Sequence, residues 1–575
     1  MRALRSLAAL FLLTAACTSG DEDATGGAGG SGANGSSSTG TPPMPGPISG
    51  PIARYDYVID VDTDAAVSTV TIDVAAPGGD CVDLESALGP AGAVKWNQED
   101  ALVAEVNAGA YHVCGSPVAP GPLAIRTPTT LVKKTFFGLD VGLSKKKDMA
   151  GGDFTYAVSW VGGCDLFGPC DDDPGALASA PLEPARLAEF HFDLAHGAGT
   201  TVLCPGTMSE GPMGTHCDLV GAPTYSAVGW AADTKWVRKP FMTASGVEWV
   251  FYEVPGGNLA GSLDPATMKT FFDWIVGLFG PFPYGNELRF AAGPTAWLGF
   301  EHPANIVLLE DLDTTATDYA DAVTHVTMHE ITHQWAGDRT TLATPLDFVW
   351  KEATSEYVPY VFEDEHLPAG VADASRAYWR AIALLATYFP RPTDTPAPAV
   401  SKFYGDVYGP GPMVLYIQLE PLIGRPTVLA GLKAFLAEPG VRSVDDLRAA
   451  LEAASGKDLK PYFDAWVFGA GEPEWPTFSI ATTAAGNEVT VTLTQENASG
   501  KIYPCVVEVE VAGATETALA TIDFGLDPKS TSASAKVTLA EPVVTTKLDP
   551  RNRLIARLKA ATPLAKPTPK RVWIF

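Results

Sequence analysis

Two histidines and two glutamates have the spacing of a catalytic metal site. Residues 329–333 read His-Glu-Ile-Thr-His. On a helix, side chains four residues apart share a face, so His329 and His333 can bind one zinc ion. Glu330 directly follows the first histidine, where it can act as general base toward a water at the metal. A catalytic zinc needs a third protein ligand, and the candidate is Glu352, 19 positions after His333. We therefore expect one Zn²⁺ per chain.

His325 lies one helical turn before His329, on the same face. Side chains from three consecutive turns diverge from a single metal ion, which disfavours a fourth ligand at this position. We expect His325 to be a packed or solvated histidine.

The sequence around these residues is similar to that of a known family. Residues 329–337 read HEITHQWAG, and the acidic candidate stands in Trp350-Lys351-Glu352-Ala353. This pattern resembles the gluzincin zinc metallo-aminopeptidases of the aminopeptidase N and leukotriene A hydrolase type. The resemblance implies that His329, His333 and Glu352 are zinc ligands and that Glu330 is the base. It covers roughly residues 55–560.

A second motif of the same family precedes the zinc motif. Residues 298–302 read Leu-Gly-Phe-Glu-His and resemble the family segment Gly-x-Met-Glu-Asn, whose glutamate binds the free amino group of the substrate. The resemblance implies that Glu301 anchors the substrate amine. Gly299 precedes it, and its lack of a side chain lets the backbone approach closely. Phe300 and His302 depart from the commonest family residues.

Two further segments resemble the family. Tyr408, in residues 407–411 (Val-Tyr-Gly-Pro-Gly), resembles the tyrosine of the family's Tyr-x-Lys-Gly, which stabilises the oxyanion by hydrogen bonding. Pro410 replaces the usual lysine, and Tyr404 is the alternative tyrosine. Residues 168–174 (Gly-Pro-Cys-Asp-Asp-Asp-Pro) resemble the Pro-Cys-Phe-Asp-Glu-Pro stretch of the family's N-terminal β domain.

The periodicity of apolar residues predicts a multidomain α+β chain in which helices position the motifs. Alternation from Tyr55 onward, continuing to about residue 255, predicts strands. Asp264-Pro265 predicts a helix start, and helical spacing dominates to about residue 470, including a helix over 443–454 that Gly456 ends. Alternation then returns.

The expected boundaries follow from these changes of period. They are a β domain over 53–255, a mostly helical domain over 256–472 and a small β-sandwich over 473–575. The family resemblance implies that the first is saddle-like and that the second is thermolysin-like.

The N-terminus has the pattern of an export signal. Arg2 and Arg5 precede a short apolar run, and small residues then lead into Cys17, so residues 1–17 are predicted to be a signal peptide. The segment also resembles a bacterial lipoprotein signal, in which Cys17 would be lipidated; ordinary secretion is the alternative. Residues 18–52 are rich in Gly, Ser and Pro and predict a flexible linker. The expected location is the cell envelope, with membrane contact only through this possible anchor.

Export permits disulfides, and six of the seven cysteines after Cys17 fall into neighbouring pairs. We expect Cys81 to pair with Cys114, Cys164 with Cys170, and Cys204 with Cys217. Cys505 remains and is expected to be a buried residue on a strand.

The overall charge excludes one class of partner. The chain has 39 basic and 67 acidic residues, giving a net charge of −28, which is unfavourable for binding nucleic acid. The predicted function is a zinc-dependent aminopeptidase acting on peptides with a free N-terminus. The alternatives are a zinc hydrolase of other specificity, such as an endopeptidase or epoxide hydrolase, and a non-catalytic binding lipoprotein.

Overall fold

A computed structural model of the chain describes residues 52–72, 81–85, 93–107, 110–114, 121–126, 133–136, 139–158, 187–223, 228–315, 321–393 and 409–559. The chain divides into two units, Met1–Met44 and Pro45–Phe575, and the described residues all belong to the second. The predicted signal peptide, Cys17 and most of the predicted linker lie outside the described residues.

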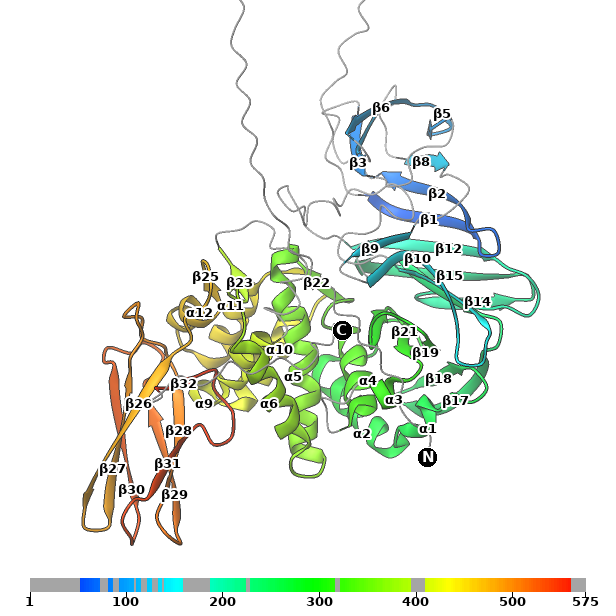
Figure 1. Cartoon of the computed structure of the whole chain (residues 1–575). Coiled ribbons are helices and arrows are strands. Elements are labelled where there is room, and N and C mark those ends of the chain that lie inside the picture. Colours follow the sequence, from blue (N-terminus) through cyan, green and yellow to red (C-terminus); the bar gives the residue numbers. More distant parts are fainter. Residues whose placement is uncertain are drawn as a thin grey trace, which may run out of the picture. The chain divides into compact units, whose positions relative to one another are not determined.

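The first part of this unit consists of strands (Figure 1). An eight-stranded sheet has the order β14-β15-β12-β1-β2-β8-β4-β5. Its central strands β1 and β12 run parallel, and alternate residues such as Tyr55 and Tyr57 are buried, with Tyr55 stacked on Phe190 at 4.9 Å. The strands are β1 (Ile52–Asp60), β2 (Ala65–Ile72), β4 (Lys95–Trp96), β5 (Glu99–Asp100), β8 (Gly121–Arg126), β12 (Leu187–Ala195), β14 (Thr207–Gly211) and β15 (Gly214–Pro223).

Two smaller sheets complete this strand-rich part. A three-stranded sheet consists of β3 (Cys81–Glu85), β7 (Ala110–Cys114) and β6 (Leu102–Asn107). A five-stranded sheet has the order β13 (Thr201–Leu203), β16 (Gly229–Asp233), β11 (Asp153–Val158), β10 (Leu139–Lys147) and β9 (Lys133–Phe136). The alternation that predicted strands from Tyr55 onward is confirmed.

A further five-stranded sheet leads into the helical part. Its order is β17 (Val237–Ala244), β18 (Val247–Glu253), β19 (Glu287–Gly293), β21 (Asn305–Leu309) and β20 (Gly299–His302). Strands β18, β19 and β21 run parallel, and β20 pairs antiparallel with β21. The sheet therefore combines strands from both sides of residue 255. The division into domains remains a prediction.

The middle of the chain is mostly helical, as its periodicity predicts. Asp264 caps α2 by accepting a hydrogen bond from Thr267 N at 2.9 Å, and Ser443 and Gly456 cap the two ends of α11. The helices are α1 (Leu259–Ser262), α2 (Pro265–Phe279), α3 (Leu312–Thr315), α4 (Ala322–His333), α5 (Phe348–His366), α6 (Val371–Ala383), α8 (Pro410–Pro412), α9 (Glu420–Ile423), α10 (Arg425–Phe435), α11 (Val444–Ser455) and α12 (Lys460–Trp466), with a 3₁₀ turn η3 (Pro345–Asp347) and a π-helical turn η4 (Met413–Ile417).

Two short strand pairs connect segments of this helical part. Strand β22 (Thr340–Leu342) pairs in parallel with β24 (Gly440–Arg442), and β23 (Arg391–Pro392) pairs in parallel with β25 (Phe468–Gly469). Both pairs bring together residues that are far apart in the sequence.

The C-terminal strands form two sheets, β30-β27-β26-β32 and β29-β28-β31. The alternate apolar residues used to predict them, such as Val491 of β27 and Val509 of β28, are fully buried. The strands are β26 (Thr477–Ala485), β27 (Glu488–Gln495), β28 (Val506–Ala512), β29 (Thr517–Asp523), β30 (Ser532–Thr538), β31 (Thr545–Leu548) and β32 (Arg557–Leu558).

Long polar side chains of the helical part bind the backbone of residues 551–556. Arg376 Nε donates to Arg551 O at 2.7 Å, and Arg380 donates to Leu554 O at 2.7 Å and to Ala556 O at 2.8 Å. Gln418 Oε1 accepts a hydrogen bond from Ile555 N at 2.6 Å. These contacts satisfy backbone groups of an irregular segment that has no strand partner there.

The cysteine predictions have different outcomes. The Cys204–Cys217 disulfide is confirmed. Cys81 lies opposite Cys114 in the β3–β7 pair, and Cys114 is disulfide-bonded, in agreement with the expected bridge. Cys164 and Cys170 lie outside the described residues.

The prediction for Cys505 is correct for burial and wrong for its element. Cys505 is buried and free, but it lies in the loop just before β28. Its backbone carbonyl accepts a hydrogen bond from Phe524 N at 2.9 Å, so the chain approaches β29 there without continuing the regular ladder.

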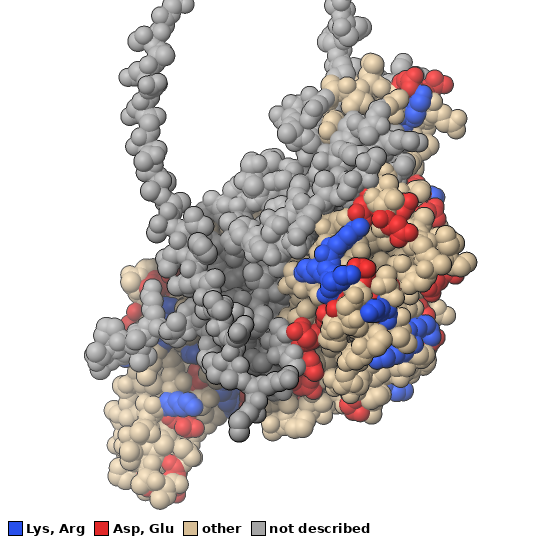
Figure 2. Space-filling view, turned by 45° about the vertical axis from the view of Figure 1, so that its right-hand side comes forward, with Lys and Arg blue, Asp and Glu red and all other residues tan. Residues whose placement is uncertain are grey.

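Acidic and basic side chains lie side by side on the face drawn in Figure 2. Among the ion pairs of the described residues, Arg238 pairs with Glu248 at 3.0 Å and with Glu287 at 3.3 Å. Within the described residues, none of the helices has the length and apolar character needed to cross a membrane.

The Cys204–Cys217 bridge is expected to stabilise the strand-rich part. Replacing both cysteines by alanine should lower the free energy of unfolding by about 3 kcal/mol, since the bridge closes a short loop between β13 and β15. Denaturant unfolding of the oxidised wild type and of the double variant measures this. The control is the same pair of proteins under reducing conditions, where their difference in stability should largely disappear, because the wild-type bridge is then broken as well. Equal stability of the two oxidised proteins would contradict the expectation.

Candidate functional site

Helices α4 and α5 pack against each other and carry the predicted zinc ligands. His329 and His333 lie on the same face of α4, with their Nε2 atoms 2.9 Å apart. Glu352 Oε2, on α5, lies 3.6 Å from each Nε2. The three ligand atoms lie within 4.8 Å of one another, so the fold brings together the set that the sequence predicts.

The other ring nitrogens of these histidines are held by acceptors. His333 Nδ1 donates to Ala336 O at 2.9 Å, and Ser355 Oγ lies 2.9 Å from the same nitrogen. His329 Nδ1 lies 3.3 Å from Glu356 Oε1. A neutral imidazole protonated on Nδ1 has its lone pair on Nε2, so two lone pairs and a carboxylate oxygen converge on one point. This donor set fits a zinc ion.

His325 lies outside the ligand group, in a buried chain of ionic hydrogen bonds. Its Nε2 lies 2.8 Å from Glu356 Oε2 and its Nδ1 lies 2.7 Å from Glu363 Oε1. His325 is 1% exposed. Burial opposes its charged form, yet the carboxylates of Glu363 and Glu356 raise the pKa of His325 to about 9. The prediction of a packed histidine is confirmed.

Glu330 lies beside the ligand group and is 2% exposed. Its Oε2 is buried and has no hydrogen-bond partner among the described residues. Burial raises the pKa of Glu330 to about 8. A carboxylate oxygen without a partner, next to three metal-ligating atoms, is suited to accept a proton from a reacting molecule.

Gly299 provides the space in which Glu330 lies. A Cβ atom at position 299 would lie 2.3 Å from Glu330 Oε1, closer than any side chain tolerates. The close approach for which Gly299 was singled out is therefore made first of all by the carboxylate of Glu330.

The sequence motifs assign no role to Lys351, yet its side chain lies between two of the predicted site residues. Its Nζ lies 2.7 Å from Glu301 Oε1 and 2.7 Å from Glu352 Oε1. Lys351 is 3% exposed and Glu301 6% exposed. Burial opposes ionisation of both glutamates, yet the Lys351 ammonium holds the pKa of Glu301 below, and that of Glu352 well below, the usual value. A charged residue directly before a predicted ligand, on a buried helix, is the signal that could have identified Lys351.

Glu301 is brought to the site by β20. Together with Glu330 and His333 it forms a second group of ligand-type atoms within 4.8 Å. His302, the next residue on the strand, points elsewhere: its Nε2 lies 3.0 Å from Tyr156 OH of β11. The alternation of a strand thus separates Glu301 from His302.

Tyr408 and its alternative Tyr404 lie outside the described residues, as does the 168–174 motif.

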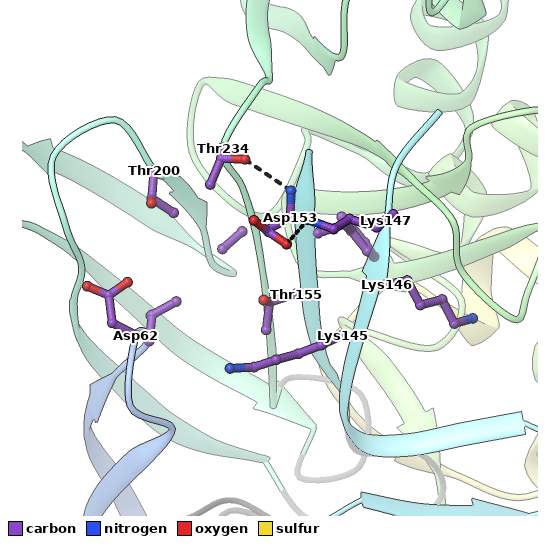
Figure 3. Close-up of a pocket in the computed structure, with 11 residues that line it drawn as sticks. Asp62, Lys145, Lys146, Lys147, Asp153, Thr155, Thr200 and Thr234 are labelled. Carbon is purple, nitrogen blue, oxygen red and sulfur yellow. Dashed lines mark hydrogen bonds and ion pairs between the residues drawn. The ribbon is translucent and has the colours of Figure 1, made fainter. Parts of the chain in front are cut away.

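A cavity of about 520 Å³ outside the site lies along β10 and β11 (Figure 3). Lys145 and Lys147 line it together with Asp153 and Thr155. Lys147 pairs with Asp153, and Lys145 Nζ lies 2.8 Å from Asp64 Oδ1. These two cations are already neutralised, and the cavity contains none of the predicted site residues.

Comparisons with known proteins agree with these motifs. Residues 298–466 match the peptidase family M1 domain. The chain is 26% identical over 239 residues to aminopeptidase 2 of Candida albicans, covering 39% of this chain and 26% of that protein. It is 26% identical over 267 residues to endoplasmic reticulum aminopeptidase 1 of Homo sapiens, covering 42% and 27%. The matched part thus spans about a quarter of the length of these relatives.

One solved structure extends the comparison to most of the chain. The fold is similar to that in the crystal structure of Legionella pneumophila aminopeptidase A in complex with aspartic acid, with a TM-score of 0.67 and 15% identity. The similarity covers 89% of this chain and 60% of that chain.

The ionic chain around His325 is expected to make stability depend on pH. Because the folded-state pKa of His325, about 9, lies above the ordinary value of 6.5, its contribution is fully present below pH 6.5 and is lost as the pH rises through 9. His325→Gln should therefore destabilise the protein by about 3 kcal/mol at pH 6 and by much less at pH 9.5. Unfolding of both zinc-loaded proteins across this range measures the difference.

A matched control is His196→Gln. His196 is also buried, but its partners are Thr215 Oγ1 and the carbonyl of Gly197 instead of carboxylates. The difference in unfolding free energy between the wild type and His196→Gln should not become smaller over the same pH range. A His325→Gln difference that is constant or grows with pH would contradict the assignment.

Proposed function

We propose that this chain is a zinc-dependent aminopeptidase that removes N-terminal residues from peptides, because residues 298–466 match the peptidase family M1 domain. The observation that supports this most is the geometry around α4 and α5. Three metal-ligating atoms, an unpaired buried carboxylate oxygen and a separate candidate anchor carboxylate lie in one buried cluster.

His329, His333 and Glu352 would hold the zinc ion. When bound, zinc polarises the scissile carbonyl and lowers the pKa of a coordinated water. Ala336 O and Glu356 fix the orientation of the two imidazoles through their Nδ1 atoms. Lys351 binds Glu352 Oε1 and so leaves Oε2 directed at the histidines.

The proton and the substrate amine would be handled by the two remaining glutamates. Glu330 would take a proton from the attacking water and pass it to the leaving amine. Glu301 would pair with the free ammonium of the peptide, which places the first peptide bond at the cluster. Tyr408 remains the proposed donor to the oxyanion.

The larger organisation is proposed on the same family basis. It comprises a saddle-like β domain, a thermolysin-like catalytic domain and a C-terminal β-sandwich. The signal-like residues 1–17 support export to the cell envelope, with Cys17 as a possible lipid anchor.

Metal-dependent turnover of free-amine substrates tests the function. A panel of aminoacyl reporter substrates should be hydrolysed by the purified chain, and chelation should abolish turnover until zinc is restored. A protein that hydrolyses none of the panel with one zinc bound would contradict the proposal and favour the non-catalytic binding lipoprotein.

Substitutions are expected to distinguish the role of a zinc ligand from that of the general base. His333→Ala should lose both zinc and turnover, because two ligands do not hold the ion. Glu330→Gln should keep one zinc per chain but lose at least about a thousandfold in kcat, since it removes the proton acceptor and no ligand. Metal analysis beside kinetics checks both variants. Full zinc and activity in His333→Ala, or full activity in Glu330→Gln, would show that the roles are wrongly assigned.

A further inference from the structure

The carboxylate proposed to bind the substrate amine already has a cation. Lys351 Nζ lies 2.7 Å from Glu301 Oε1, and both side chains are almost completely buried. The same ammonium lies 2.7 Å from Glu352 Oε1. Lys351 thus forms an ion pair with one carboxylate oxygen of each of these two glutamates. The pair with Lys351 uses Glu301 Oε1, and Oε2 is the other oxygen, which a substrate could bind.

This pairing lowers the free-energy cost of binding a substrate that has no ammonium. A site rejects a ligand that lacks a polar group chiefly because its own buried partner is then left unpaired. If Glu301 had no other cation, such a ligand would leave a buried carboxylate without compensation. With Lys351 in place, Glu301 stays paired whichever substrate binds.

The pairing also weakens the attraction for a substrate that has an ammonium. An amine bound at Glu301 Oε2 would lie only a few ångströms from the Lys351 ammonium. Like charges this close repel each other, and the repulsion is stronger where water is excluded. The free amine therefore gains less from Glu301 than it would from an unpaired carboxylate.

We propose that Lys351 is a specificity-determining residue that widens the substrate range to acyl amides whose first residue carries no ammonium. This inference rests on the proposed function, because it concerns the same hydrolytic site. Lys351 acts through Glu301, by keeping that carboxylate paired when no substrate amine is present.

The test compares two substrates that differ in the ammonium and not in bulk elsewhere. These are an alanyl reporter amide and the corresponding propionyl amide. The wild-type ratio of kcat/KM, alanyl over propionyl, should lie far below the roughly 10⁴-fold discrimination that a site with an unpaired partner reaches. Lys351→Met keeps the length and removes the charge, and it should raise this ratio at least tenfold. Lys351→Arg should leave it within about threefold of the wild-type value.

A binding measurement provides a readout that does not depend on turnover. In a Glu330→Gln background, calorimetry of alanine amide and propionamide should show the same change in selectivity on adding Lys351→Met. Lys239→Met is the control, since Lys239 Nζ lies 2.6 Å from Oε2 of the fully buried Glu253, outside the site. It should leave both ratios unchanged.

Each other result overturns the inference. An unchanged or lower ratio in Lys351→Met would show that Lys351 does not control the amine requirement. Loss of zinc in that variant would place its role at Glu352 instead. If the wild type hydrolyses the alanyl substrate but Lys351→Met leaves the alanyl-over-propionyl ratio unchanged, only this inference fails. If it hydrolyses neither substrate, the proposed function itself fails.

Discussion

The structure around α4 and α5 depends on one constraint: several negatively charged carboxylates are buried close together, away from water. Glu301, Glu330, Glu352 and Glu356 are between 1% and 6% exposed. Carboxylates in one buried cluster repel each other and are poorly solvated, so each requires a compensating cation or must bind a proton. The cationic side chains of the region are placed accordingly. One ammonium serves two glutamates and His325 serves Glu356, whereas Glu330 has no such partner and burial raises its pKa to about 8.

The helices that carry this cluster of charges are almost completely buried. Every residue of α4 is buried, and so are the first sixteen residues of α5. Excluding water strengthens each ionic contact and also makes an unsatisfied one costly, so the site admits little freedom in side-chain orientation. The proposed zinc ion would supply the largest positive charge, and the arrangement of Nε2 and Oε2 atoms is directed at it.

The linear spacing predicted those parts of the site that lie on one helix or are separated by a fixed spacer. His329 and His333 share a face because of helical periodicity, and Glu352 followed from the family spacer. Lys351 and Glu356 could not be assigned in this way, because their roles depend on contacts between α4, α5 and β20 that no local period specifies. Cys505 shows the same limit. Its apolar neighbours predicted a strand, but the regular pairing of β28 begins one residue later.

The link between the helical part and residues 551–556 has an evolutionary consequence. Arg376, Arg380 and Gln418 bind backbone atoms there and not side chains. A backbone carbonyl or N–H is present whatever residue occupies the position, proline's missing N–H excepted. Substitutions in residues 551–556 therefore leave these hydrogen bonds intact, and only burial constrains Leu554, Ile555 and Ala556 there. Replacing any of the three residues that donate or accept from the helical part would instead remove the bonds themselves. Among homologues, the freely variable positions of this junction should thus be the exposed ones of the held segment, such as Arg551.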